Sequence, residues 1–149
     1  MKTKIRLCLA LVLNGALTAL CSGTDGPNSL RVVVKPAKSQ VRVNEGFKVA
    51  LRVENPAETN QTVRVMSCSW CQEWKASDPR ISWSPPECAK NLAISIKIPP
   101  HGVYTNELEM SVLQPIAQKT LSFRMGFTSI DSMKTFWSDA VTISIAPPK

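Results

Sequence analysis

The sequence has few of the residues that enzymes use for acid–base or nucleophilic chemistry. Histidine occurs once among 149 residues, as His101, within a Pro-Pro-His-Gly stretch that is typical of a turn. There is no Gly-x-Ser-x-Gly elbow, no phosphate-binding glycine loop and no His-Glu-x-x-His helix. Glu107 and Glu109 are alternate residues of an extended segment, so both point to one face, which we expect to be solvated. We therefore expect a protein that is not an enzyme and that has no catalytic residues.

Long apolar runs are also missing, since the longest spans only residues 7–20 and contains Asn14. That length is short for a transmembrane helix. The run follows three basic residues and ends at the small residues 21–23, an order that predicts a secretory signal over residues 1–23. We expect the protein to be exported, to the periplasm or the extracellular space. Residues 17–21 are also similar to a bacterial lipoprotein cleavage site, although Leu20 stands where Gly, Ala or Ser is usual; membrane attachment is expected only if Cys21 is lipidated.

The sequence also lacks clusters of like charge. Without residues 1–23 the chain has 15 Lys and Arg against 11 Asp and Glu, a net charge of +4. The basic residues are scattered singly, whereas a nucleic-acid surface needs a basic patch. We therefore expect no nucleic-acid partner. A mild positive charge favours acidic partners or anionic envelope surfaces through long-range attraction.

The rest of the sequence consists of short apolar segments separated by turns. Eleven prolines fall mostly between these segments, and residues 47–54, 92–98 and 120–128 alternate apolar and polar residues, as half-buried strands do. Leu92, Ile94, Ile96 and Ile98 would share one face. No segment of helical periodicity is long enough to connect parallel strands. After a polar lead at residues 24–29, we expect one all-β domain of seven to eight strands over residues 30–146.

This strand pattern resembles an immunoglobulin-like β-sandwich over residues 30–145. The resemblance implies two antiparallel sheets packed face to face. It rests on strand pattern only, because the paired-cysteine-plus-tryptophan spacing of antibody domains is missing.

Residues 67–91 break the pattern, and we expect an irregular, ordered excursion between two strands. Three cysteines and three tryptophans lie in this segment. Ser69 with Gln72 fits a helix capping box, and Trp70 and Trp74 would then share one face of a helical turn.

The cysteines favour a structural interpretation, because exported cysteines usually pair. Position along the chain favours a Cys68–Cys88 disulfide, with Cys71–Cys88 as the alternative, and leaves Cys71 as a free thiol. A second interpretation is thiol–disulfide chemistry at the Cys68-x-x-Cys71 pair. A third is zinc bound by the three cysteines and His101. Twelve residues separate Cys88 from His101, which is too many for the usual ligand spacing, so we expect no metal and no cofactor.

The tryptophans also have more than one interpretation. Exposed rings can stack on sugars, and large rings beside a disulfide commonly pack on the core. Aromatic residues also dominate protein interfaces. The sequence favours an exported, non-catalytic module that binds a protein or an envelope component, such as an accessory of an envelope assembly, through Trp70, Trp74 and Trp83. Thiol–disulfide or metal handling and carbohydrate binding remain as alternatives.

Overall fold

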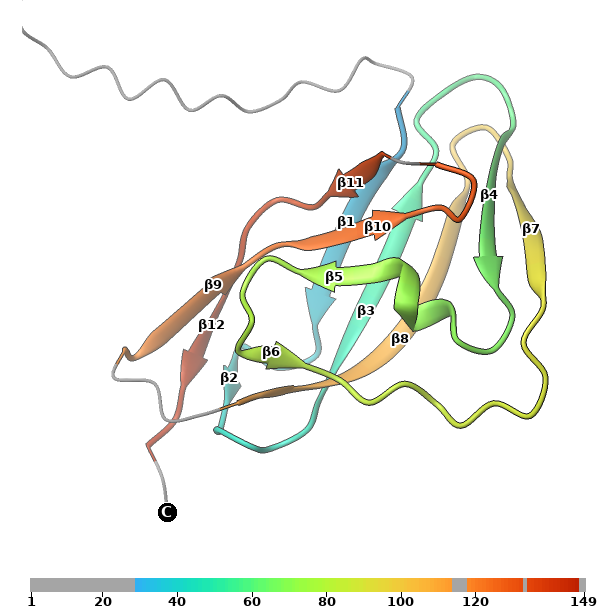
Figure 1. Cartoon of the computed structure of the whole chain (residues 1–149). Coiled ribbons are helices and arrows are strands. Elements are labelled where there is room, and N and C mark those ends of the chain that lie inside the picture. The colour runs from blue at the N-terminus through green and yellow to red at the C-terminus, as the bar shows by residue number, and fades with distance from the viewer. Residues whose placement is uncertain (1–28, 114–117, 133, 148–149) are drawn as a thin grey trace, which may run out of the picture.

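The computed structural model describes residues 29–113, 118–132 and 134–147. This part of the chain is all-β, as predicted, and contains one turn of 3-10 helix (Figure 1). The predicted signal over residues 1–23 and Cys21 lie outside the described residues. In chain order the elements are β1 (Arg31–Pro36), β2 (Gln40–Val41), β3 (Phe47–Glu54), β4 (Gln61–Met66), η1 (Trp70–Glu73), β5 (Trp74–Ala76), β6 (Ile81–Ser82), β7 (Ala93–Ile98), β8 (Val103–Val112), β9 (Thr120–Phe123), β10 (Met125–Thr128), β11 (Thr135–Trp137) and β12 (Val141–Ile145).

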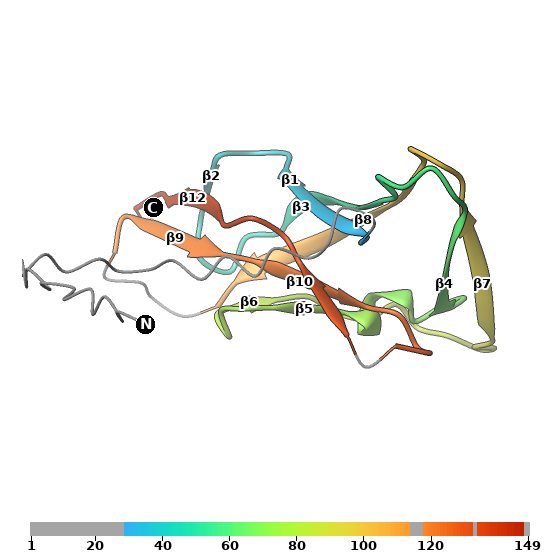
Figure 2. The same ribbon diagram turned by 90° about the horizontal axis from the view of Figure 1, so that it is seen from above.

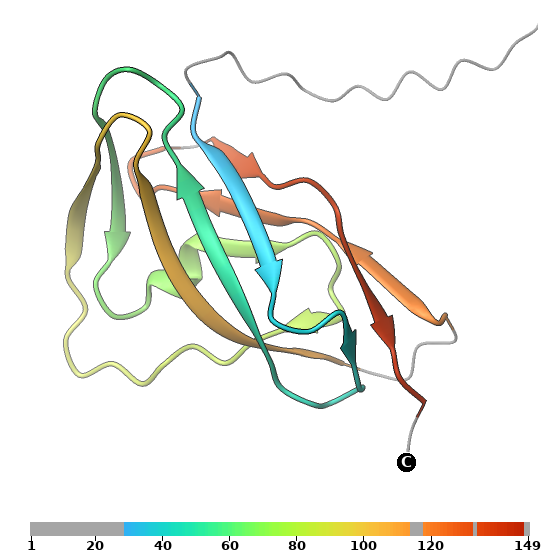
Figure 3. The ribbon, with the colours of Figure 1, turned by 180° about the vertical axis from the view of Figure 1, so that it is seen from behind.

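The first layer is an antiparallel sheet in the order β1-β3-β8-β6, seen in Figure 3 with β1, β3 and β8 towards the viewer. β3 pairs with β8 along its whole length. Its alternate residues 47, 49, 51 and 53 are buried, because successive side chains of a strand point to opposite faces. Glu107 and Glu109 project from the outer face, as predicted. The Lys48 ammonium donates a 2.7 Å hydrogen bond to Glu107 across this face.

The second layer consists of two three-stranded sheets, β11-β10-β5 and β2-β12-β9 (Figure 2). Residues 120–128, expected as one strand, divide between these sheets at Arg124. The Arg124 backbone exchanges hydrogen bonds with Ser77, through Ser77 N–H to Arg124 O and Arg124 N–H to Ser77 Oγ. The chain therefore changes partners at Arg124, and the buried alternation continues from Phe123 to Met125 without a break.

The core lies between the two layers and combines residues from nearly every strand. Its largest fully buried side chains include Phe123, Phe127, Leu51, Met110 and Met125. Burial of such side chains contributes about 1.5–3 kcal/mol each. No helix of the described residues is long and apolar enough to cross a membrane.

β4 and β7 form a separate antiparallel ribbon at one end of the molecule (Figures 1 and 2). Val63 and Val65 of β4 are 1% exposed, whereas the cover on β7 decreases along the strand from buried Ile98 through partly buried Ile96. Ile94 is 39% exposed and Leu92 is 68% exposed. The expected apolar face of residues 92–98 therefore exists, but its half at Leu92 and Ile94 is exposed.

The loop that leads into this ribbon is organised by one buried polar residue, Asn55. Its Nδ2 donates to the carbonyl oxygens of Thr59, Ile98 and Pro99 at 2.8–3.1 Å, and its Oδ1 accepts from Ala57 N–H. Asn55 thus links the β3–β4 loop to the β7–β8 turn, in which His101 has a φ of 55°. Such left-handed backbone is uncommon outside glycine.

Candidate functional site: the disulfide-bridged excursion

The segment that breaks the strand pattern, residues 67–91, is called here the excursion. It is irregular over most of its length, as predicted, but it also contains two short strands that the sequence did not indicate. β5 pairs with β10 of the second layer, and β6 pairs with β8 of the first. The excursion therefore contacts both layers of the fold through the two strands in its middle.

The two ends of the excursion are joined by hydrogen bonds and by a disulfide. Ser67 N–H donates to Leu92 O at 2.8 Å, and Leu92 N–H donates to Ser67 Oγ at 3.1 Å. The Cys68–Cys88 disulfide, with a Cα–Cα distance of 5.9 Å, confirms the favoured pairing. Asn91 Oδ1 accepts hydrogen bonds from the backbone N–H groups of Cys68 and Ser69. These contacts hold the two ends of the excursion together.

The expected capping box and helical face are wrong. The Ser69 side chain caps no backbone N–H and donates instead to Gln72 Oε1 at 3.2 Å. Only four residues, Trp70–Glu73, form the 3-10 turn. Trp74 begins β5, because its backbone pairs with Phe127 in β10. Trp70 and Trp74 thus belong to different elements and do not share a helical face.

The three predicted binding tryptophans have different surroundings. Trp74 is 3% exposed, and its ring centroid is 5.2 Å from that of Phe127 in the core. Trp70 and Trp83 are partly buried and pack against the core from the surface. Trp70 and Trp83 therefore keep part of their surface in solvent, whereas Trp74 belongs to the core.

Beyond Trp83 the chain runs to the disulfide without regular structure. Residues 84–87 are all exposed and include Pro85 and Pro86. Proline fixes the backbone in an extended conformation and lowers the entropy cost of ordering on binding. Since Cys88 is bonded to Cys68, this exposed stretch is anchored at both ends.

A set of buried polar groups beneath the excursion was not indicated by the sequence. Glu73 Oε1 accepts from Met66 N–H at 3.4 Å, while Glu73 Oε2 is buried without a hydrogen-bond partner among the described residues. Burial raises the pKa of Glu73. Burial, followed by the nearby Glu73 charge, raises the pKa of Tyr104. The sequence signal was weak, because one glutamate in a polar-looking segment resembles any surface residue.

The remaining cysteine, Cys71, is the free thiol among the described residues and is fully buried. Desolvation, with the Glu73 charge, raises the pKa of its thiol. A reactive thiol needs a lowered pKa and access to solvent. The Cys68 sulfur is bonded to Cys88, so the Cys-x-x-Cys spacing does not form a reactive pair in this structure.

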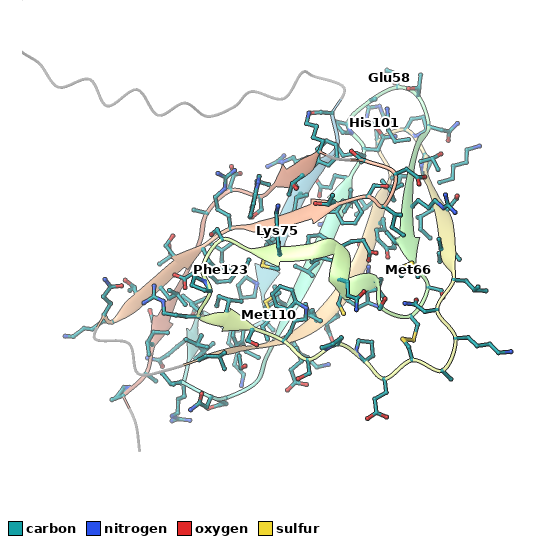
Figure 4. The ribbon with its side chains drawn as sticks, in the orientation of Figure 1. Glu58, Met66, Lys75, His101, Met110 and Phe123 are labelled. Carbon is teal, nitrogen blue, oxygen red and sulfur yellow. A yellow bond between two sulfur atoms is a disulfide. The ribbon has the colours of Figure 1, made fainter. Side chains whose placement is uncertain are left out.

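The fourth residue of the possible zinc set, His101, lies in the turn between β7 and β8. Its Nε2 is 3.2 Å from a carboxylate oxygen of Glu58, and Figure 4 shows these two side chains together at the top of the molecule. The disulfide is drawn as a yellow bond lower in the same view. In the ranges the structure describes, no three His, Cys, Asp or Glu side chains are close enough to hold a metal ion.

No family model matches the chain, and no curated protein shows significant similarity to it.

Proposed function

We propose that the protein is an exported, non-catalytic, immunoglobulin-like module that binds a protein or an envelope component through the outer face of the excursion. One observation carries the proposal. Trp83 is partly exposed next to a proline-containing stretch, and that stretch is fixed by strands at one end and by a disulfide at the other.

The geometry of this face supports binding because the chain is held at both ends before a partner arrives. Ordering side chains and loops on association is costly, so a segment held in place binds more tightly than a mobile one. Interface hot spots are enriched in tryptophan, and Trp70 and Trp83 are the two that keep part of their surface in solvent. Burial of Trp74 leaves fewer exposed rings for stacking on a sugar, which favours a protein partner over a carbohydrate.

Export is proposed from the N-terminal pattern and from the disulfide. A disulfide of this kind is typical of oxidising compartments, and Cys68–Cys88 supplies it. The immunoglobulin-like assignment is supported by two facing layers of antiparallel strands.

The experiment is photo-crosslinking in the cells that produce the protein. A photoreactive phenylalanine analogue at Ser84, which is exposed beside Trp83, is compared with the same analogue at Thr105, which is exposed on the outer face of β8. We expect a discrete adduct from position 84 and none from position 105. The Trp83→Ala variant should lose that adduct while its circular dichroism stays native. An adduct that persists in a folded Trp83→Ala variant would contradict the proposal.

A further inference from the structure

The ribbon of β4 and β7 has one covered edge and one open edge. Arg64 in β4 donates its N–H to Ser129 Oγ at 2.8 Å and accepts at its carbonyl from Ile130 N–H at 2.9 Å. Met66 N–H is bonded to Glu73. The outward backbone of β4 is therefore occupied by other parts of the fold at Arg64 and Met66. β7 is the ribbon strand whose outer edge is open.

The register of the ribbon shows which β7 groups face outward. Ser67 and Leu92 exchange hydrogen bonds, so the pairs that follow at every second position, Val65↔Ile94 and Val63↔Ile96, are also hydrogen-bonded pairs. The intervening residues Ala93, Ser95 and Lys97 must direct their N–H and C=O groups away from β4. No residue of the described part of the chain bonds to those groups. Figures 1, 2 and 3 all place β7 at the outer edge of the molecule, with nothing drawn beyond it.

This edge lacks the devices by which proteins protect exposed strands. Natural edge strands are commonly very short, interrupted by proline or bulged, or they carry several charges. β1, also six residues long, ends in Pro36. β7 has six residues without proline, and Lys97 is its single charge. The apolar side chains of Leu92 and Ile94 next to this edge are 68% and 39% exposed.

We propose that β7 pairs antiparallel with β7 of a second copy of this chain, forming a continuous four-stranded sheet in the order β4-β7-β7-β4. This interaction is separate from the excursion and goes beyond the proposed function. The sequence of β7 is complementary to itself when Ser95 lies opposite Ser95 of the second copy. In that register the three outward-facing residues of each copy pair with one another, giving about six backbone hydrogen bonds.

The side chains fit the same register. Lys97 falls opposite Ala93 of the second copy, so the two lysines do not face each other. Ile94 falls opposite Ile96, so apolar residues meet on the other face. Like charges directly opposite destabilise a strand pair, and apolar β-branched pairs stabilise it. A single pair of short strands is a small interface, so we expect a dimer with a dissociation constant of about 100 µM.

The test is sedimentation equilibrium of the exported chain from about 10 µM to about 1 mM, a range that spans this dissociation constant. In the Ala93→Lys variant, the new lysine of each copy lies opposite Lys97 of the other copy. In the Ala93→Glu variant, a carboxylate takes that place in each copy. We expect Ala93→Lys to weaken the dimer about fivefold or more and Ala93→Glu to strengthen it about fivefold. Ala140→Lys, the same change at an exposed alanine before β12, is the matched control and should leave the dissociation constant unchanged.

A second variant tests the backbone directly. Ser95→Pro removes an N–H that faces away from β4, so the ribbon keeps its internal bonds while the edge loses a donor. We expect this variant to be monomeric. A chain that is monomeric throughout the concentration range would overturn the proposal, as would a dimer that responds to neither Ala93 substitution. The excursion is unchanged in these variants, so loss of the dimer with a retained Ser84 adduct would leave the proposed function standing.

Discussion

Removing the Cys68–Cys88 disulfide tests how the excursion is stabilised. The change is the double variant Cys68→Ser, Cys88→Ser, which leaves buried Cys71 as the single described thiol. The native fold should survive, because β5, β6 and the Ser67–Leu92 bonds hold the excursion independently of the sulfur atoms. The variant should lose stability because its unfolded chain gains conformational freedom when the cross-link is absent.

The magnitude follows from the length of the closed loop. The two cysteines are 20 residues apart, and the chain-entropy relation gives about 3 kcal/mol for a loop of that size. For a domain of this length the loss corresponds to a fall in Tm of about 10 °C. Urea unfolding followed by circular dichroism measures the free energy of unfolding for both proteins. We also expect the m-value to rise, because an uncross-linked unfolded chain exposes more surface.

Two outcomes would refute this reasoning. A loss below about 1 kcal/mol would mean that the bond does not restrict the unfolded chain as the entropy relation requires. Loss of amide protection in β5 and β6 of the folded variant would mean that the disulfide, and not strand pairing, holds the excursion on the sheets.

Three further predictions concern the buried residues. Asn55→Ala should lower the free energy of unfolding by about 3 kcal/mol, because it leaves several loop carbonyls and one N–H without a partner. A loss below about 1 kcal/mol in urea unfolding would contradict this prediction. Because burial raises the folded-state pKa of Glu73, its contribution to stability is full below the ordinary glutamate pKa of about 4.3 and is lost as pH rises through the raised value. Glu73→Gln should therefore raise the free energy of unfolding at pH 7 and flatten its pH dependence above about pH 4.3. An unchanged pH dependence in the variant would exclude Glu73 as its source. Trp74→Ala should lower the free energy of unfolding by about 4 kcal/mol, because it leaves a cavity beside Phe127. Trp83→Ala, measured by the same urea unfolding, should lower it by less than half as much. Equal losses would place both rings in the core.

The sequence was informative where burial follows a simple alternation. β3 alternates along all eight residues, and its buried positions are those that the pattern indicates. The Cys68–Cys88 pairing followed from position, because Cys68 comes just after one strand and Cys88 just before the strand that pairs with it.

Other features depend on distant parts of the chain and could not be derived from local pattern. The alternation from Leu121 to Phe127 is unbroken, yet the strand divides at Arg124 because Ser77, far away in sequence, takes over the backbone bonds. Trp74 is core and Trp83 is surface because of what lies opposite each ring. The open edge of β7 has the same cause, since alternation cannot show that no further strand pairs with it.

Intact-mass spectrometry of the protein from its native compartment, with free thiols alkylated before any reduction, tests the central claim most directly. An exported module with a fixed excursion should begin near Gly23, carry one alkyl group on Cys71 and weigh two hydrogens less than the reduced chain. Alkylation should need a denaturant, because Cys71 is fully buried. A chain that keeps residues 1–23 and carries alkyl groups on Cys68, Cys71 and Cys88 would contradict both export and the disulfide that fixes the excursion.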